Sequence, residues 1–134
     1  MTTLTAVSSL PADDAGPDVE AERAERAAAI MDRESAAYAF QIDSASKAKR
    51  HPETLLKWSN PAEGSIYGGV YLWTVDERPV VAGSLYQWYS PHTHRSHEFV
   101  SLTADAVSGE YEGQPVWNVQ QPGITWRELN DAPR

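Results

Sequence analysis

The sequence contains no cysteine in its 134 residues. Disulfide bridges, thiol catalysis, zinc fingers and cysteine-ligated iron–sulfur clusters are therefore excluded. No apolar run approaches the roughly 18 residues of a membrane-spanning helix, so no membrane partner is expected. The first dozen residues lack the basic and apolar regions of a signal peptide, which favours a cytoplasmic location, although a chain without cysteine suits the periplasm equally well.

Basic residues are also scarce. The chain carries 11 Lys and Arg against 19 Asp and Glu, a net charge of −8. Affinity for a phosphate backbone comes from Lys and Arg that displace counterions, so nucleic acid is not expected as a partner. The one basic cluster, KAKRH at 47–51, is predicted to be a solvated connector.

The apolar content is sufficient for one hydrophobic core. Hydrophobic residues make up 41% of the chain and include five Trp, which fits a single domain at this length. Residues 1–17 are predicted to be a flexible leader, 18–130 a single α+β domain and 131–134 a flexible tail.

Helical character is confined to the region after the leader. Asp18 is the predicted N-cap, and residues 19–37 are rich in Ala, Glu and Arg, which favour helix. In YAFQID at 38–43 apolar residues alternate with Ala39, Gln41 and Asp43, which indicates a strand, with continuation of the helix as the alternative.

Two β-prone runs, SIYGGVYLWTV at 65–75 and PVVAGSLYQWYS at 79–90, predict an antiparallel hairpin. In the first run Ile66, Val70 and Leu72 share one face, and Tyr67, Tyr71 and Trp73 share the other. If Val75 pairs near Val80, then Trp73 lies close to Ala82 and Trp88 lies near Tyr67, which would form an aromatic band. Core packing is the favoured role of such aromatic residues, with stacking of a flat ligand as the alternative.

Further short strands are predicted at 97–103, 107–113, 114–119 and 124–129, separated by turn residues. The expected fold is therefore α+β, with an N-terminal helix packed on a curled antiparallel β-meander or partial barrel of about six or seven strands.

A histidine cluster, SPHTHRSHEF at 90–99, offers the most conspicuous candidate site. His92, His94 and Glu98 have the H-x-H-x3-E spacing of the first cupin motif, whose imidazoles and carboxylate hold iron, manganese or zinc. The chain has no histidine after His97 to complete such a set, and Tyr86 stands where that motif has glycine. The alternative is that residues 92–97 form an exposed polar loop.

The favoured hypothesis needs no cofactor. It is a small-molecule binding pocket near THRSHEF, where few polar groups meet aromatic walls; the candidate ligand-binding residues are Trp58, Trp88, His94, His97 and Glu98. The rivals are a metal-dependent enzyme that uses His92, His94 and Glu98, and a structural or protein-interaction domain. No nucleophile motif is present, so no catalytic residue is assigned.

The blocks WSNP at 58–61, VYLWT at 70–74, RP at 78–79, WYSP at 88–91 and THRSHEF at 93–99 resemble an uncharacterised family of bacterial proteins typical of planctomycetes. The resemblance covers about residues 54–126 and implies no activity. In that family the position of His92 is usually not histidine, which leaves His94, His97 and Glu98 as the polar core of the pattern. Family members tend to be longer, which implies that this chain is a short form.

Overall fold

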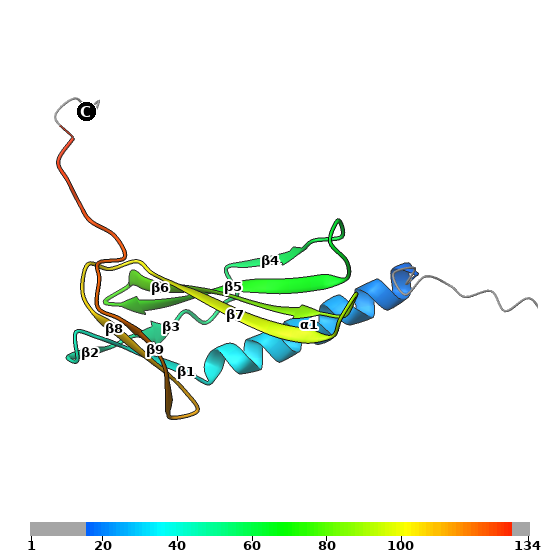
Figure 1. Ribbon diagram of the computed structural model, residues 1–134, viewed down its shortest axis with the longest axis horizontal. Helices are drawn as coiled ribbons and strands as arrows, with labels where there is room; N and C mark the ends of the chain where they lie inside the picture. Colours follow the sequence, from blue (N-terminus) through cyan, green and yellow to red (C-terminus); the bar gives the residue numbers. More distant parts are fainter. Residues whose placement is uncertain (1–15, 130–134) are drawn as a thin grey trace, which may run out of the picture.

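The computed structural model describes residues 16–129, which form one α-helix followed by nine strands in two antiparallel sheets. The predicted α+β class is therefore confirmed, with no closed barrel (Figure 1). Most of the predicted leader and the whole tail at 131–134 lie outside the described residues.

The helix, α1 (Pro17–Ala36), begins two residues earlier than the sequence suggested. Gly16 is the N-cap, so the prediction of Asp18 at this position is wrong. The fixed backbone angle of Pro17 suits the first helical position, and Asp18 lies in the first turn, where the helix dipole favours a carboxylate.

Sheet A contains four strands in the order β2-β1-β8-β9. Their bounds are β1 (Tyr38–Ile42), β2 (Ser46–Lys47), β8 (Val107–Tyr111) and β9 (Gln114–Val119). The strand at 38–42 is thus confirmed, and the alternative of a continued helix is not observed.

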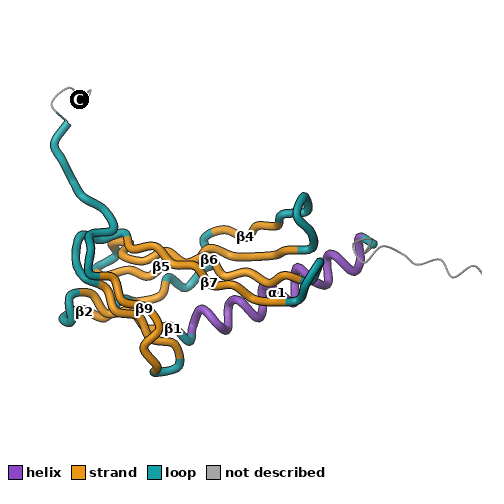
Figure 2. Tube along the Cα trace, viewed as in Figure 1, coloured by secondary structure: helices purple, strands orange, loops and turns teal. Residues whose placement is uncertain are grey.

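Sheet B is longer and has the order β3-β5-β6-β7, with β4 also paired to β5. Its strands are β3 (Lys49–Arg50), β4 (Leu56–Ser59), β5 (Ile66–Val75), β6 (Arg78–Trp88) and β7 (His94–Ser101). The basic segment at 47–51, expected as a connector, instead contains the last residue of β2 and all of β3, and its Ala48 is buried. The chain passes from sheet A to sheet B between these two strands, within the strand-rich body that Figure 2 shows.

The central hairpin is confirmed, but its register differs by one residue from the expected one. Trp73 pairs with Val81 and Trp88 with Ile66, and a bulge follows at Trp73/Thr74. Because a slip of one residue moves side chains to the opposite face, Trp73 and Trp88 lie on different faces of sheet B. The expected aromatic band across the hairpin therefore does not form.

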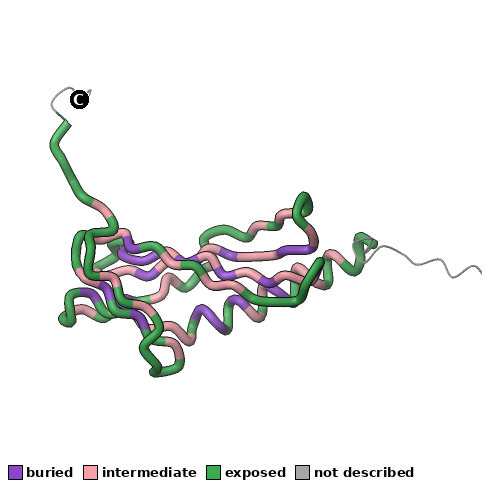
Figure 3. Tube along the Cα trace, viewed as in Figure 1, coloured by how far each residue is buried: buried purple, intermediate pink, exposed green. Residues whose placement is uncertain are grey.

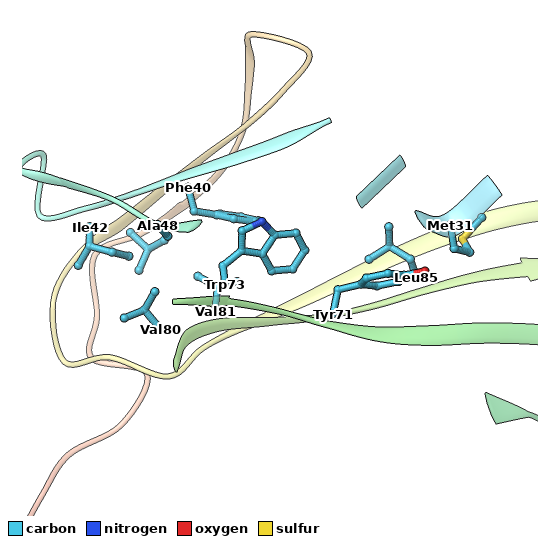
Figure 4. Packing of buried hydrophobic residues seen from close by; sticks show 10 residues of the cluster. Met31, Phe40, Ile42, Ala48, Tyr71, Trp73, Val80, Val81 and Leu85 are labelled. Atoms are coloured by element: carbon cyan, nitrogen blue, oxygen red, sulfur yellow. The ribbon is translucent and has the colours of Figure 1, made fainter. Parts of the chain in front are cut away.

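The core lies on one face of sheet B, which is called the inner face here. Helix α1 and sheet A both pack on it, with Met31 of α1 and Phe40 of β1 in the same buried cluster as Trp73 and Leu85 (Figures 3 and 4). The ring centroids of Phe40 and Trp73 are 4.8 Å apart. Core packing is thus the role of Trp73, as the sequence favoured.

The outer face of sheet B is the opposite one. No helix or strand within residues 16–129 packs on it, since α1 and sheet A both contact the inner face. The described part of the chain also contains no helix long and apolar enough to cross a membrane.

The predicted strand at 124–129 is not observed. After β9 the chain bends at Gln121 and Gly123, and residues 124–129 lead away from both sheets without a strand partner among the described residues (Figure 1). The sequence pattern is that of a strand, but a strand requires a neighbouring edge, and none is paired with this segment.

Candidate functional site

Four of the five residues predicted to bind a ligand lie on the outer face of sheet B. Pairing places Trp58 beside Gly68, Trp88 beside His94, and Glu98 beside Ser84. His97 pairs with Leu85 and points to the inner face. Side chains alternate along a strand, as expected for His97 and Glu98, so the five residues do not line one pocket.

Aromatic rings cover much of the outer face. Trp88 stacks on His94 with centroids 5.0 Å apart, and Trp58 lies 5.3 Å from Tyr86. Trp58 reaches this position because Gly68 lies beneath it: a β-carbon at Gly68 would lie 2.5 Å from the indole ring. Glycine in β5 therefore permits the close approach of β4.

Polar groups fix this arrangement at two points. The indole N–H of Trp58 donates to the hydroxyl of Ser84 at 3.3 Å, and the Tyr86 hydroxyl donates to the Glu98 carboxylate at 2.8 Å. Burial, together with this hydrogen bond to Glu98, raises the pKa of Tyr86. The phenol therefore stays protonated and continues to donate at neutral pH.

The same face exposes aliphatic side chains that the sequence did not single out. Leu56 is 57% exposed and Val100 is 52% exposed. Between them lies an open depression of about 320 Å³, whose lining includes Val70, Ala82, Ser84, Glu98 and Val100. The sequence signal for this apolar surface is the spacing of Val70 and Leu72 in β5, which places both side chains on the same face of the sheet.

The metal-site alternative is not supported by the geometry of the described chain. His94 and Glu98 lie four residues apart on one continuous strand, a separation of about 13 Å. His92 belongs to the preceding loop. Within residues 16–129 no three His, Asp or Glu side chains are grouped to hold a metal ion.

On the inner face His97 belongs to a polar network that joins α1 to both sheets. Its Nε2 is hydrogen-bonded to the Glu34 carboxylate at 2.8 Å, and its Nδ1 is hydrogen-bonded to the Tyr38 hydroxyl at 2.5 Å. Arg95 donates to the other oxygen of Glu34 at 2.5 Å and to Gln87 at 2.8 Å. Glu34 is buried, so its charge depends on these partners for compensation.

This network could hardly be predicted from the sequence. Glu34 was one acidic residue among several in a helix, and Tyr38 was one alternating residue of a strand. They meet because Glu34 lies in the last turn of α1, and β1 starts only two residues after the helix ends. Both then face β7, which is 59 or more residues away in the chain.

Tyr38 should be among the last tyrosines of the folded protein to ionise. Burial, with contributions from Tyr111 and Glu34, raises its pKa from 10.0 to about 12. Between these values the unfolded chain loses this proton and the folded chain keeps it, so stability falls as pH rises from 10 through 12. Below pH 10 the phenol is neutral in both states, and stability is unaffected by its titration.

A spectrophotometric titration of tyrosinate checks this expectation. Tyr38→Phe should remove one late-titrating group and reduce the loss of stability above pH 10. In urea, all six tyrosines should ionise together near the ordinary pKa, which provides the control. An unchanged late step in Tyr38→Phe would contradict the assignment.

A further depression, lined in part by the Asp76–Glu77 turn, lies at that end of the β5–β6 hairpin. It has a volume of about 800 Å³. Its basic lining comes from Lys47, Lys49, Arg50 and His51, and Asp76 and Glu77 face it as well. Arg50 already pairs with Asp32 and stacks over Tyr71, so the cavity has mixed charge.

No protein-family model matches this chain, and no curated protein or solved structure matches it. The resemblance to the planctomycete family stays a prediction, as does ligand binding by the residues of the outer face. The geometry of residues 16–129 therefore carries the functional argument.

Proposed function

We propose that this chain is a protein-interaction domain that takes up an extended polypeptide segment along β7, with side chains of that segment resting on the outer face of sheet B. The observation that carries the proposal is the combination of a free strand edge and an uncovered apolar face on the same strand. Strand addition supplies backbone hydrogen bonds, and alternate side chains of the added strand supply specificity.

The edge of β7 is regular and unprotected. It pairs with β6 from Val81↔Ser101 to Trp88↔His94 without a bulge, and it contains no proline. Among residues 16–129 no strand pairs with its other side. Proline, bulges and very short strands commonly block exposed edges, and β7 has none of these. Gly123 contacts its last residue, Ser101, so the edge that can accept a further strand is residues 94–100.

The other edges of the two sheets show these protective features. β9 contains Pro115 and joins β8 through a bulge at Gly109/Glu110. β2 and β3 have two residues each, and β4 has four. The contrast singles out β7.

The outer face beside this edge favours a polypeptide over a small molecule. A small-molecule site usually encloses most of its ligand, whereas the depression between Val70 and Val100 is open and shallow. Exposed apolar surface that spans several strands is typical of a protein-binding face. The predicted residues Trp58, Trp88, His94 and Glu98 line this face, so the proposal retains four of the five.

Selection of peptides from a displayed random library against the full chain tests this proposal. We expect extended peptides with apolar or aromatic residues at alternate positions. Val100→Lys, on the outer face of β7, should weaken the binding of selected peptides at least about tenfold, or about 1.4 kcal/mol.

Val116→Lys is the matched control, because Val116 is similarly exposed (55%) but lies on β9 of sheet A. This variant should bind the peptides as the wild type does. The amides of an added strand point alternately toward β7 and away from it. N-methylation of the amides that face β7 should therefore abolish binding, and N-methylation of the intervening amides should be tolerated. Equal binding by Val100→Lys, or insensitivity to N-methylation in both phases, would refute the proposal.

A further inference from the structure

We propose that the segment bound along β7 is the C-terminal arm, residues 120–129, of a second copy of this chain. The inference rests on the proposed function and names the partner for that same edge. It starts from two observations: β7 has a free edge, and residues 124–129 have the residue alternation of a strand but form none in the described chain.

The arm has the properties of a strand without a sheet. Residues 124–129 form no regular element and follow bends at Gln121 and Gly123. The Gly123 N–H, which donates to the Thr103 carbonyl at 2.9 Å, forms the arm's one backbone hydrogen bond with the described body. Trp126 is 85% exposed and Leu129 is also exposed. An indole that is so fully solvated forgoes the burial of about 150–250 Å² that an aromatic side chain gains in a core or interface.

The side chains of the arm match the surface beside β7. On an extended segment Ile124 and Trp126 share one side. In one of the two possible pairing phases that side faces outward with Val100, which brings the indole of Trp126 to the open depression of about 320 Å³ between Val70 and Val100. Arg127 and Glu128 cancel in charge, so the arm adds no net charge to an acidic surface.

The direction of the arm favours a second copy over its own sheet. A β-carbon at Gly123 would lie 2.2 Å from the Ser101 carbonyl oxygen, so the arm starts in contact with the end of its own β7. From there it runs away from both sheets (Figure 1). Two chains that exchange arms around a two-fold axis make the same contact twice. Once the first contact has formed, the second is intramolecular and therefore strengthens the dimer.

Sedimentation or light scattering over a range of protein concentrations tests this inference with the full chain. Wild-type protein should dimerise. Trp126→Ser should raise the dissociation constant at least about 30-fold, as expected for a central aromatic anchor, and Trp126→Phe should restore most of the association. Added salt should strengthen the dimer, because each copy carries a net charge of −8 and salt screens their repulsion.

Mixing two defective variants provides the sharpest measurement. Trp126→Ser has an intact edge and a defective arm, whereas Val100→Lys has an intact arm and a defective outer face. Each should be largely monomeric alone, and together they should form a one-to-one heterodimer through a single arm contact. The control replaces Val100→Lys by Val116→Lys in the mixture with Trp126→Ser. Val116 lies outside the proposed contact, so Val116→Lys should dimerise by itself as the wild type does.

A synthetic peptide of residues 120–129 separates failure of this inference from failure of the proposed function. The peptide should bind Trp126→Ser and should not bind Val100→Lys. A monomeric wild type, a dimer that survives Trp126→Ser, or a mixture that stays monomeric would overturn the exchange of arms. The proposed function would still stand if library peptides bound along β7, and it would fall separately if they did not.

Discussion

Trp73→Ala should lower the free energy of unfolding by about 3–5 kcal/mol, the largest effect expected for a single substitution in this chain. Trp73 is 1% exposed, and its ring lies 4.8 Å from Phe40 and 5.9 Å from Phe99. The indole thus fills the space between the two sheets, and alanine leaves a cavity that the surrounding strands cannot fully close. Equilibrium unfolding in urea measures the change.

Trp73→Phe is the informative control for this prediction. The indole N–H of Trp73 is buried and has no hydrogen-bond partner among the described residues, which costs free energy in the wild type. Phenylalanine keeps most of the ring and removes that donor, so the loss of stability should be less than half of that for alanine. Similar losses for both variants would show that the indole N–H is satisfied in solution.

His97→Ala should lower the free energy of unfolding by about 2–4 kcal/mol. The substitution removes the hydrogen bonds to Glu34 and Tyr38 and leaves the buried Glu34 carboxylate with Arg95 as its remaining partner. The interaction joins the last turn of α1 to β7, so the helix should also exchange its amide protons faster. Urea unfolding and amide hydrogen exchange are the two measurements.

The neighbouring residue provides the matched control. Glu98 is exposed on the outer face and is held by one hydrogen bond from Tyr86. Glu98→Ala should therefore change stability by about 0.5 kcal/mol or less. Equal destabilisation by His97→Ala and Glu98→Ala would contradict the assignment of these two residues to different faces.

This contrast explains how one short motif serves two purposes. In THRSHEF the inward side chains of Arg95, His97 and Phe99 hold β7 against the helix and sheet A. The outward side chains of His94 and Glu98 face solvent. A strand that is firmly fixed on one face can present its other face and its edge to a partner with little loss of conformational entropy.

The sequence by itself determined the elements with strong local periodicity. The alternation of Tyr38 and Phe40 with Ala39 and Gln41 predicted β1, and the runs at 65–75 and 79–90 predicted the hairpin. These patterns can be read locally, because side chains on a strand alternate between its two faces regardless of what the strand packs against. The placement of His97 and Glu98 on opposite faces of the strand could be predicted for the same reason. The α+β class could be predicted from these elements and from the Ala-rich helix.

The tertiary structure alone decided which groups meet. The bulge at Trp73/Thr74 set the hairpin register, and the packing of α1 brought Glu34 to His97 across 63 residues of sequence. Ile124 and Trp126 alternate as in a strand, but their segment has no strand partner within the described chain. Local pattern fixes the direction of a side chain, whereas pairing and burial depend on contacts between distant segments, and these decided that His97 supports the fold and Glu98 faces solvent.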